Sequence, residues 1–362
     1  MESVMTQASS STTSSKPKNF GFKNLIWFIV VLTLVVVILG ALQKLVMPKY
    51  MGVSKEGTLI EEYYRENKDF DVIFVGDCEV YENFVPAVLW EEHGINSYIR
   101  GSAQQLIWHS YYLMEETLKY EHPDVFVFNV LSMKYDEPQS EAYNRMTLDG
   151  MRWSPAKIKS IRASMTDKES FIEYVFPILR YHSRLSELEK DDFTYYFHKN
   201  QVGDNGYFMQ LGVVPADYVP ESRPLGDYTF GDTSYEYLDR MTKLCKDNDI
   251  ELILIKAPSL YPTWFDEWDA QMEEYASEND LKYINFLEYT DEIGLDFTVD
   301  TYDAGLHLNL SGAKKLTSYF GDWLTDNVEL KDRRNEEALV NEWDKKLKLY
   351  YDKQIPKGEQ NE

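Results

Sequence analysis

The chain has 362 residues, 44% of them hydrophobic and 15% aromatic, so it can bury a large core and is neither collagen-like nor disordered in composition. Its formal net charge is −24, and such an acidic surface repels phosphate backbones, which argues against a nucleic-acid partner. Cys78 and Cys245 are the two cysteines, too few for a disulfide framework. We expect no bridge between them, because Cys78 ends a predicted strand and Cys245 falls inside a helical pattern.

The first predicted element is a membrane span. Leu25 to Leu42 contains no charged residue, and about 20 apolar residues cross a bilayer as a helix. Lys16, Lys18 and Lys23 flank its N-terminal side, which predicts a cytoplasmic N-terminus. We expect a cytoplasmic tail (1–23), an uncleaved anchor (24–47) in the cell membrane, and an extracytoplasmic remainder. A cleaved signal peptide is the less favoured alternative, since the run is long and no convincing cleavage site follows.

The next segment alternates between helical and buried-strand patterns. Pro123 ends one helical pattern, and Pro86 suits the first turn of another. The predicted helices are Glu56–Asn67, Val85–Glu92 and Gln104–Tyr120, and the predicted strands are Asp71–Val75, Asn96–Arg100 and Asp124–Val130.

Residues 136–230 have a different texture. Helical patterns over Lys157–Met165 and Lys168–Glu189 are followed by loops that contain several glycines and prolines. No alternation of strand and helix is visible, so we expect a mainly helical insertion that caps the main domain.

Alternation then returns. The predicted helices are Ser234–Asp247, Trp264–Asn279 and Ser311–Trp323, with Ser311 as N-cap, and the predicted strands are Glu251–Lys256 and Lys282–Phe286. Short apolar strands between helices imply a parallel sheet covered on both faces. We therefore predict a flavodoxin-like, three-layer α/β/α domain formed by 52–135 and 231–330. Residues 331–362 should form a charged, solvated helix and tail.

Three polar groups should meet where ligands bind such sheets, beyond the carboxyl ends of the strands. Gly76-Asp77-Cys78 follows the first strand, and Gly101-Ser102-Ala103-Gln104 follows the second. The third group, which contains Asp303, His307 and Asn309, precedes the last helix of the domain.

Together these groups resemble the SGNH (GDSL-like) hydrolase superfamily, with cysteine in place of the nucleophilic serine. The resemblance covers roughly 70–130 and 235–326. It implies a Cys78–His307–Asp303 triad and an oxyanion hole formed by the N–H groups of Cys78 and Gly101. The acid–histidine spacing is one residue longer than in the family, which leaves Asp300 as an alternative acid. The Gly-x-Asn block is missing, which leaves Asn129, Gln104 and Gln105 as candidate polar donors to the oxyanion.

Other polar residues are expected to line the cleft: Asp77, Glu79, Gln105 and Asn309. Phe176–Leu185 resembles a segment of membrane-anchored SGNH proteins from cell-surface polysaccharide loci, and it adds His182 and Arg184 to the cleft. Arg184 paired with one of the many acids is an equally good interpretation. We expect no cofactor and no metal, because no compact histidine–carboxylate motif is present.

The predicted function is an extracytoplasmic acyltransferase or esterase that acts on O-acyl groups of a cell-surface polysaccharide through a thioester on Cys78. A thiolate is intrinsically more nucleophilic than an alkoxide, and a thioester retains enough free energy to acylate a sugar hydroxyl. The alternative is a non-catalytic SGNH-like subunit that binds glycan or serves as a scaffold beside a membrane-bound O-acyltransferase.

Overall fold

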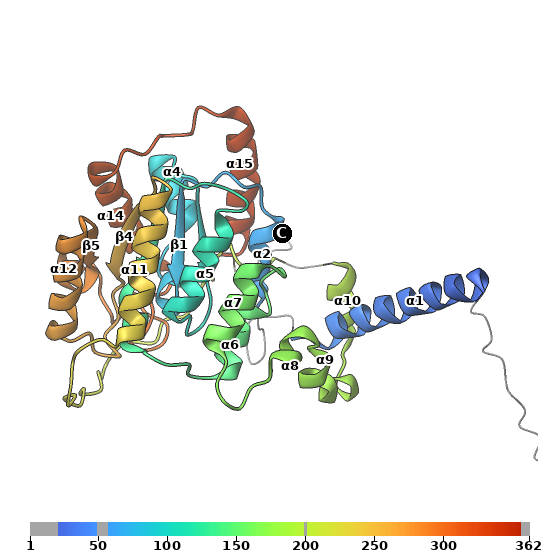
Figure 1. Ribbon diagram of the computed structural model, residues 1–362. Coiled ribbons are helices and arrows are strands. Elements are labelled where there is room, and N and C mark those ends of the chain that lie inside the picture. Colours follow the sequence, from blue (N-terminus) through green and yellow to red (C-terminus); the bar gives the residue numbers. More distant parts are fainter. Residues whose placement is uncertain (1–20, 49–56, 199–200, 356–362) are drawn as a thin grey trace, which may run out of the picture.

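A five-stranded parallel sheet forms the centre of the computed structural model, which describes residues 21–48, 57–198 and 201–355 (Figure 1). The strand order is β2-β1-β3-β4-β5, the flavodoxin-like order. The fold class predicted from the sequence is therefore confirmed. The strands are β1 (Val72–Gly76), β2 (Ser97–Gly101), β3 (Val125–Asn129), β4 (Glu251–Lys256) and β5 (Lys282–Asn285).

Successive side chains of each strand point to opposite faces of the sheet, and helices bury both faces. Val72 and Phe74 of β1 belong to one core cluster, and Ile73 and Val75 belong to the other. One face is covered by α4 (Pro86–His93) and α14 (Leu310–Asn327), and the other by α5 (Ile107–Thr117), α11 (Asp232–Asp247) and α12 (Asp266–Asn279). The shorter elements are α2 (Thr58–Glu62), η1 (Tyr63–Arg65), α3 (Cys78–Tyr81), η2 (Val130–Lys134), η4 (Phe286–Tyr289) and α13 (Thr290–Ile293).

The apolar segment near the N-terminus forms α1 (Phe22–Val46). It is long and apolar enough to cross a membrane, and its length and composition fit either an anchor or a signal sequence. Most of the predicted tail lies outside the described residues.

The segment after β3 and η2 contains α6 (Glu141–Leu148), α7 (Pro155–Ser164), α8 (Phe171–Val175), α9 (Ile178–Tyr181), η3 (His182–Ser186) and α10 (Lys190–Phe197). The single helix expected over Lys168–Glu189 is wrong. Pro177 lacks an N–H donor and disfavours helical conformation at the preceding residue, so the chain breaks into α8, α9 and η3.

Two further expectations need correction. Asn309, rather than Ser311, caps α14, because its Oδ1 accepts from the N–H groups of Ser311 and Gly312 at 3.0 and 3.2 Å. The C-terminal helix α15 (Glu337–Asp352) is not fully solvated. Trp343 and Tyr350 are buried seven residues apart on one stripe, and Trp343 stacks on Trp90 of α4.

Candidate functional site

Cys78 lies at the start of α3, directly after β1, at the carboxyl edge of the sheet. The turn requires glycine at position 76, which has a φ of 156° and where a Cβ would lie 2.5 Å from Val80 Cγ2. The Asp77 side chain caps α3 by accepting from Glu79 N at 3.2 Å. Because β1 lies between β2 and β3, the thiol occupies the point where the strand order reverses, the usual ligand position in such sheets.

His307 and Asp303 come to the same place from the loop that precedes α14. Asp303 Oδ2 lies 2.7 Å from His307 Nδ1, and Asp303 Oδ1 accepts the His307 backbone N–H at 2.8 Å. The other ring nitrogen, Nε2, is buried without a hydrogen-bond partner among the described residues. The Cys78 thiol lies close enough to this imidazole for each group to shift the pKa of the other. The structure thus places Cys78, His307 and Asp303 at the same edge of the sheet.

A second carboxylate, Glu82, reaches the same imidazole. Its Oε2 lies 3.3 Å from His307 Nδ1 and accepts a hydrogen bond of 2.8 Å from the Tyr302 hydroxyl. The Tyr302 ring stacks on the imidazole at 6.1 Å between centroids. Sequence reasoning missed both residues. The available signal was the spacing of Cys78 and Glu82, since residues four apart share one face of a helix.

These neighbours control the protonation of the pair. Burial, followed by the charge of Asp77, raises the pKa of the Cys78 thiol to about 11, against the influence of His307. Burial disfavours the charged imidazole, but the hydrogen bond to Asp303 and the interactions with Cys78 and Glu82 outweigh it and raise the pKa of His307. Burial also raises the pKa of Glu82. The resting imidazole therefore keeps its proton to higher pH than a free histidine does.

The residues on either side of Cys78 belong to a separate buried ion-pair cluster: Asp77, Glu79, Asn129, Lys256 and Ser259. Glu79 pairs with Lys256 Nζ at 2.8 Å and accepts from Ser259 Oγ at 2.6 Å. Asn129 Nδ2 donates to Asp77 Oδ1 and to Glu79 Oε2, and its Oδ1 accepts from Ala257 N. All three side-chain contacts of Asn129 are therefore within the fold, which corrects its expected role as an oxyanion donor.

The charges in this cluster are buried. Burial opposes ionisation of Glu79, but Lys256 and the hydrogen bonds hold the pKa of its carboxyl below the usual value. Burial and the Glu79 charge raise the pKa of Asp77 to about 6. Glu79 is 1% exposed, so it does not line a cleft as expected. Lys256 was missed, although a charged residue at the end of the apolar strand β4 was a visible signal.

Three residues near the end of β2 were expected to form or support the oxyanion hole, and the structure places them in different surroundings. Gly101 ends β2 beside Gly76, and a Cβ there would lie 3.1 Å from the Tyr81 side chain. Gln104 adopts a left-handed conformation with a φ of 49°, and its side chain lies near the Tyr135 hydroxyl. Gln105 is fully buried and donates to Arg100 O and Ser110 Oγ. Gln105 therefore supports the turn and does not face a cleft.

The remaining candidates have other partners in the fold. Asp300 is buried against Lys315, 2.6 Å away, and accepts from Asp296 N, so it is not the acid on His307. Asn309 caps α14. His182 is exposed, and its Nδ1 lies 3.0 Å from Leu179 O. Arg184 pairs with Asp192 at 3.0 Å, which is the alternative left open for it.

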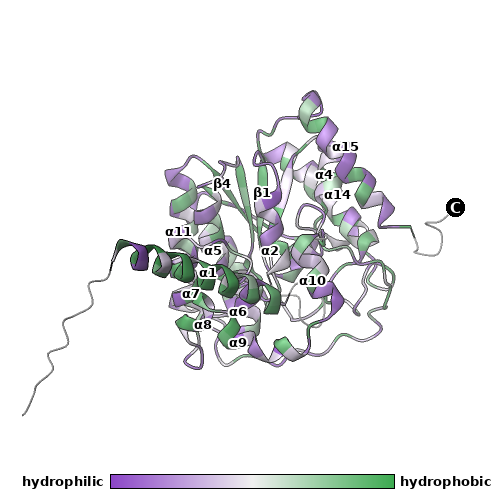
Figure 2. Cartoon of the chain, turned by 90° about the vertical axis from the view of Figure 1, so that its right-hand side faces the viewer, coloured by the Kyte–Doolittle hydropathy of each residue, from purple (hydrophilic) through white to green (hydrophobic). Residues whose placement is uncertain are grey.

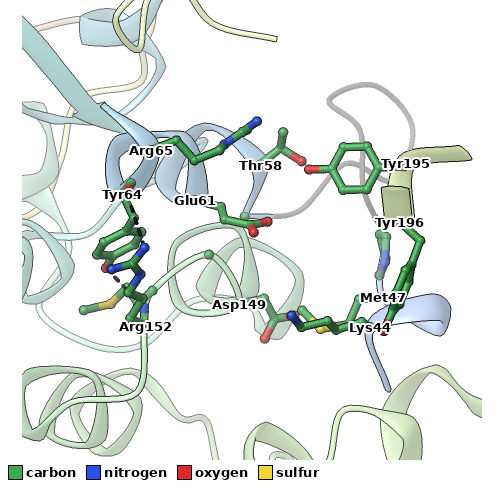
Figure 3. Close-up of a pocket in the computed structure, with 14 residues that line it drawn as sticks. Lys44, Met47, Thr58, Glu61, Tyr64, Arg65, Asp149, Arg152, Tyr195 and Tyr196 are labelled. Atoms are coloured by element: carbon green, nitrogen blue, oxygen red, sulfur yellow. Dashed lines mark hydrogen bonds between the residues drawn. The ribbon is translucent and has the colours of Figure 1, made fainter. Parts of the chain in front are cut away.

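A cavity of about 480 Å³ lies elsewhere, between the end of α1, α2, the loop before α7, and α10 (Figure 3). Basic and acidic side chains both line it. Two of these charges already have partners in the fold: Asp149 pairs with Arg145, and Arg152 donates to Tyr64 O. Among the described residues, no group of three or more histidine, cysteine and acidic side chains could hold a metal ion.

Sequence comparisons with known proteins do not assign this chain to a family. No protein-family model matches the chain, and no curated protein matches it. Among solved structures, the chain is similar to a Bacteroides fragilis protein described as "a putative acylhydrolase", at 12% identity and a TM-score of 0.36. The match covers 74% of this chain and 94% of that one. Likeness at this level carries no argument about activity.

Proposed function

We propose that this chain is an extracytoplasmic, SGNH-like acyltransferase or esterase that acts on O-acyl groups of a cell-surface polysaccharide. The observation that carries the proposal is the thiol of Cys78 beside an imidazole whose Nδ1 is held 2.7 Å from Asp303. A nucleophile, a base and a group that orients the base are the requirements for acyl transfer through a covalent intermediate.

The chemistry follows from this geometry. Above its raised pKa, His307 is neutral and accepts the thiol proton at Nε2, and Sγ attacks the carbonyl carbon of the acyl ester. The imidazolium then gives its proton to the departing alkoxide, which leaves a thioester on Cys78. A sugar hydroxyl or water attacks the thioester after giving its proton to His307, and the thiol leaves with that proton. The N–H groups of Cys78 and Gly101 are the proposed donors to the oxyanion, and one such donor is worth about 3 kcal/mol.

The test is formation of the covalent intermediate. Full-length protein in detergent is mixed with an activated acyl ester, and its intact mass is measured. We expect one acyl group on Cys78, no adduct in Cys78→Ala, and an unchanged adduct in Cys245→Ala, because Cys245 is buried in α11. An unlabelled wild type, together with normal polysaccharide acylation in a Cys78→Ala strain, would overturn the proposal.

A second candidate function is a non-catalytic, glycan-binding or scaffold subunit beside a membrane-bound O-acyltransferase. The raised pKa of Cys78 favours it, because a thiol that keeps its proton is a weak nucleophile. This candidate predicts no acyl adduct, and it predicts that loss of the whole chain, but not Cys78→Ala, reduces polysaccharide acylation.

A further inference from the structure

A group of apolar side chains surrounds the base of α1 and is exposed to solvent. We define this membrane-side patch as Leu179 of α9, Leu185 of η3, and Phe193, Tyr196 and Phe197 of α10. Phe197 is 78% exposed and Phe193 is 49% exposed. Exposed aromatic and aliphatic side chains gathered in this way usually mark a surface that binds a partner or a membrane.

The patch is fixed to the end of α1. Helix α1 contacts α9, η3 and α10. Arg184 donates to Val46 O at 2.7 Å and pairs with Asp192 of α10 at 3.0 Å. One guanidinium therefore ties the last turn of α1 to the elements that carry the patch. In Figure 1, α9 and α10 lie on opposite sides of the base of α1, and in Figure 2 both lie on the face from which α1 projects.

The level of the patch along α1 matches a membrane surface. The side chains of α1 are exposed from Phe22 to Ile38, partly buried in most of the next two turns, and fully buried at Val46. At 1.5 Å per residue, the charge-free run from Leu25 to Leu42 spans roughly 25 Å, most of the thickness of a hydrocarbon core, and Val46 lies only about 6 Å beyond it. Phenylalanine, tyrosine and leucine side chains commonly insert at this depth, in the headgroup region.

We propose that α9, η3 and α10 form an interfacial foot. This foot rests on the outer surface of the cell membrane, with the patch inserted among the lipids. The proposal uses α1 as a retained span, but it does not depend on the acyl-transfer chemistry. The occupant is lipid, because the patch continues the lipid-facing surface of α1. The foot fixes the angle between the ectodomain and the bilayer.

The test measures depth with nitroxide labels on the full chain in lipid nanodiscs, after intact mass has confirmed that α1 is retained. Single cysteines replace Phe193 or Phe197 in a Cys78→Ser/Cys245→Ala background. The matched control is Leu349→Cys on α15, because Leu349 is 51% exposed and Phe193 is 49% exposed. We expect the ratio of oxygen to nickel-complex collisions to be severalfold higher at both patch positions than at position 349.

Two results would overturn the proposal. A ratio at both patch positions equal to that at position 349 would place the patch in water. Dipolar broadening between labels that disappears on dilution with unlabelled protein would identify a second copy of the chain as the occupant. Neither readout depends on activity, so failure here is distinguishable from failure of the proposed chemistry.

Discussion

The two polar clusters at the carboxyl edge of the sheet differ in how their charges are paired, although their residues alternate along the chain between positions 77 and 82. In the buried ion-pair cluster, the Glu79 carboxylate meets a lysine ammonium, an amide and a hydroxyl. In the thiol–imidazole cluster, defined as Cys78, Glu82, Tyr302, Asp303 and His307, two carboxylates share one imidazole, and His307 Nε2 is left without a hydrogen-bond partner among the described residues. The first arrangement favours rigidity, and the second leaves an atom that can accept or donate a proton.

The largest expected effect comes from removing both carboxylates that contact His307. In Asp303→Asn/Glu82→Gln, the imidazole loses both carboxylates that orient it and stabilise its charged form, and we expect kcat to fall by about 10⁴-fold, the typical result of losing the triad acid. Each single variant should lose less, because the other carboxylate still lies within 3.3 Å of Nδ1. Rates of acyl-ester turnover measure this.

The control for that experiment is Asp300→Asn, which alters the carboxylate paired with Lys315. The rate per folded molecule should stay near that of the wild type. A collapse of turnover in Asp300→Asn with normal turnover in the double variant would show that the acid has been misassigned.

Substitutions in the buried ion-pair cluster should change the stability of the fold instead of the rate of turnover. Lys256→Met leaves the buried Glu79 carboxylate without its cation, and breaking such a pair typically costs about 3–5 kcal/mol. Adding Glu79→Gln should recover much of the loss, since no unpaired charge then remains. Urea unfolding in detergent measures the free energy of unfolding.

The matched control is Lys243→Met, which removes an exposed pair with Asp247. Exposed pairs contribute less than about 1 kcal/mol. Equal losses from the two lysine variants would mean that burial of Lys256 contributes nothing special to stability.

The sequence was sufficient to predict the parallel sheet, because each strand is a short apolar run between helices. It also predicted Cys78, His307 and Asp303 as candidate site residues, because Cys78 follows a strong strand signal and the other two precede a strong helix signal. It was insufficient for Lys256 and Tyr302, whose roles depend on contacts between residues 177 and 220 positions apart. The helix over Lys168–Glu189 failed for a local reason, because apolar spacing was given more weight than Pro177.

The next prediction concerns the pH dependence of turnover. His307 acts as a base only when neutral, so activity should be present above its pKa and lost as the pH falls through it. Since Glu82 helps to raise this pKa, Glu82→Gln should move the acidic limb of the pH–rate profile to lower pH by about one unit. A Glu92→Gln control alters an exposed carboxylate on α4 and should leave the profile in place. An unmoved or upward-shifted limb in Glu82→Gln would show that Glu82 does not stabilise the imidazolium.

The smallest expected effect concerns the start of α14. Asn309 accepts from two backbone N–H groups of the first turn, and its Nδ2 donates to Val299 O at 2.8 Å. Loss of an N-cap side chain costs about 1 kcal/mol, so Asn309→Ala should lower the free energy of unfolding by that amount. Ser311→Ala should have almost no effect, because Ser311 lies inside the helix and its N–H is already bonded to Asn309. Because Asn309 lies two residues after His307, Asn309→Ala should also lower turnover slightly by loosening the loop that positions the imidazole. If Ser311→Ala were the more destabilising variant, the cap would belong to Ser311, and the His307 loop would be held by the helix alone.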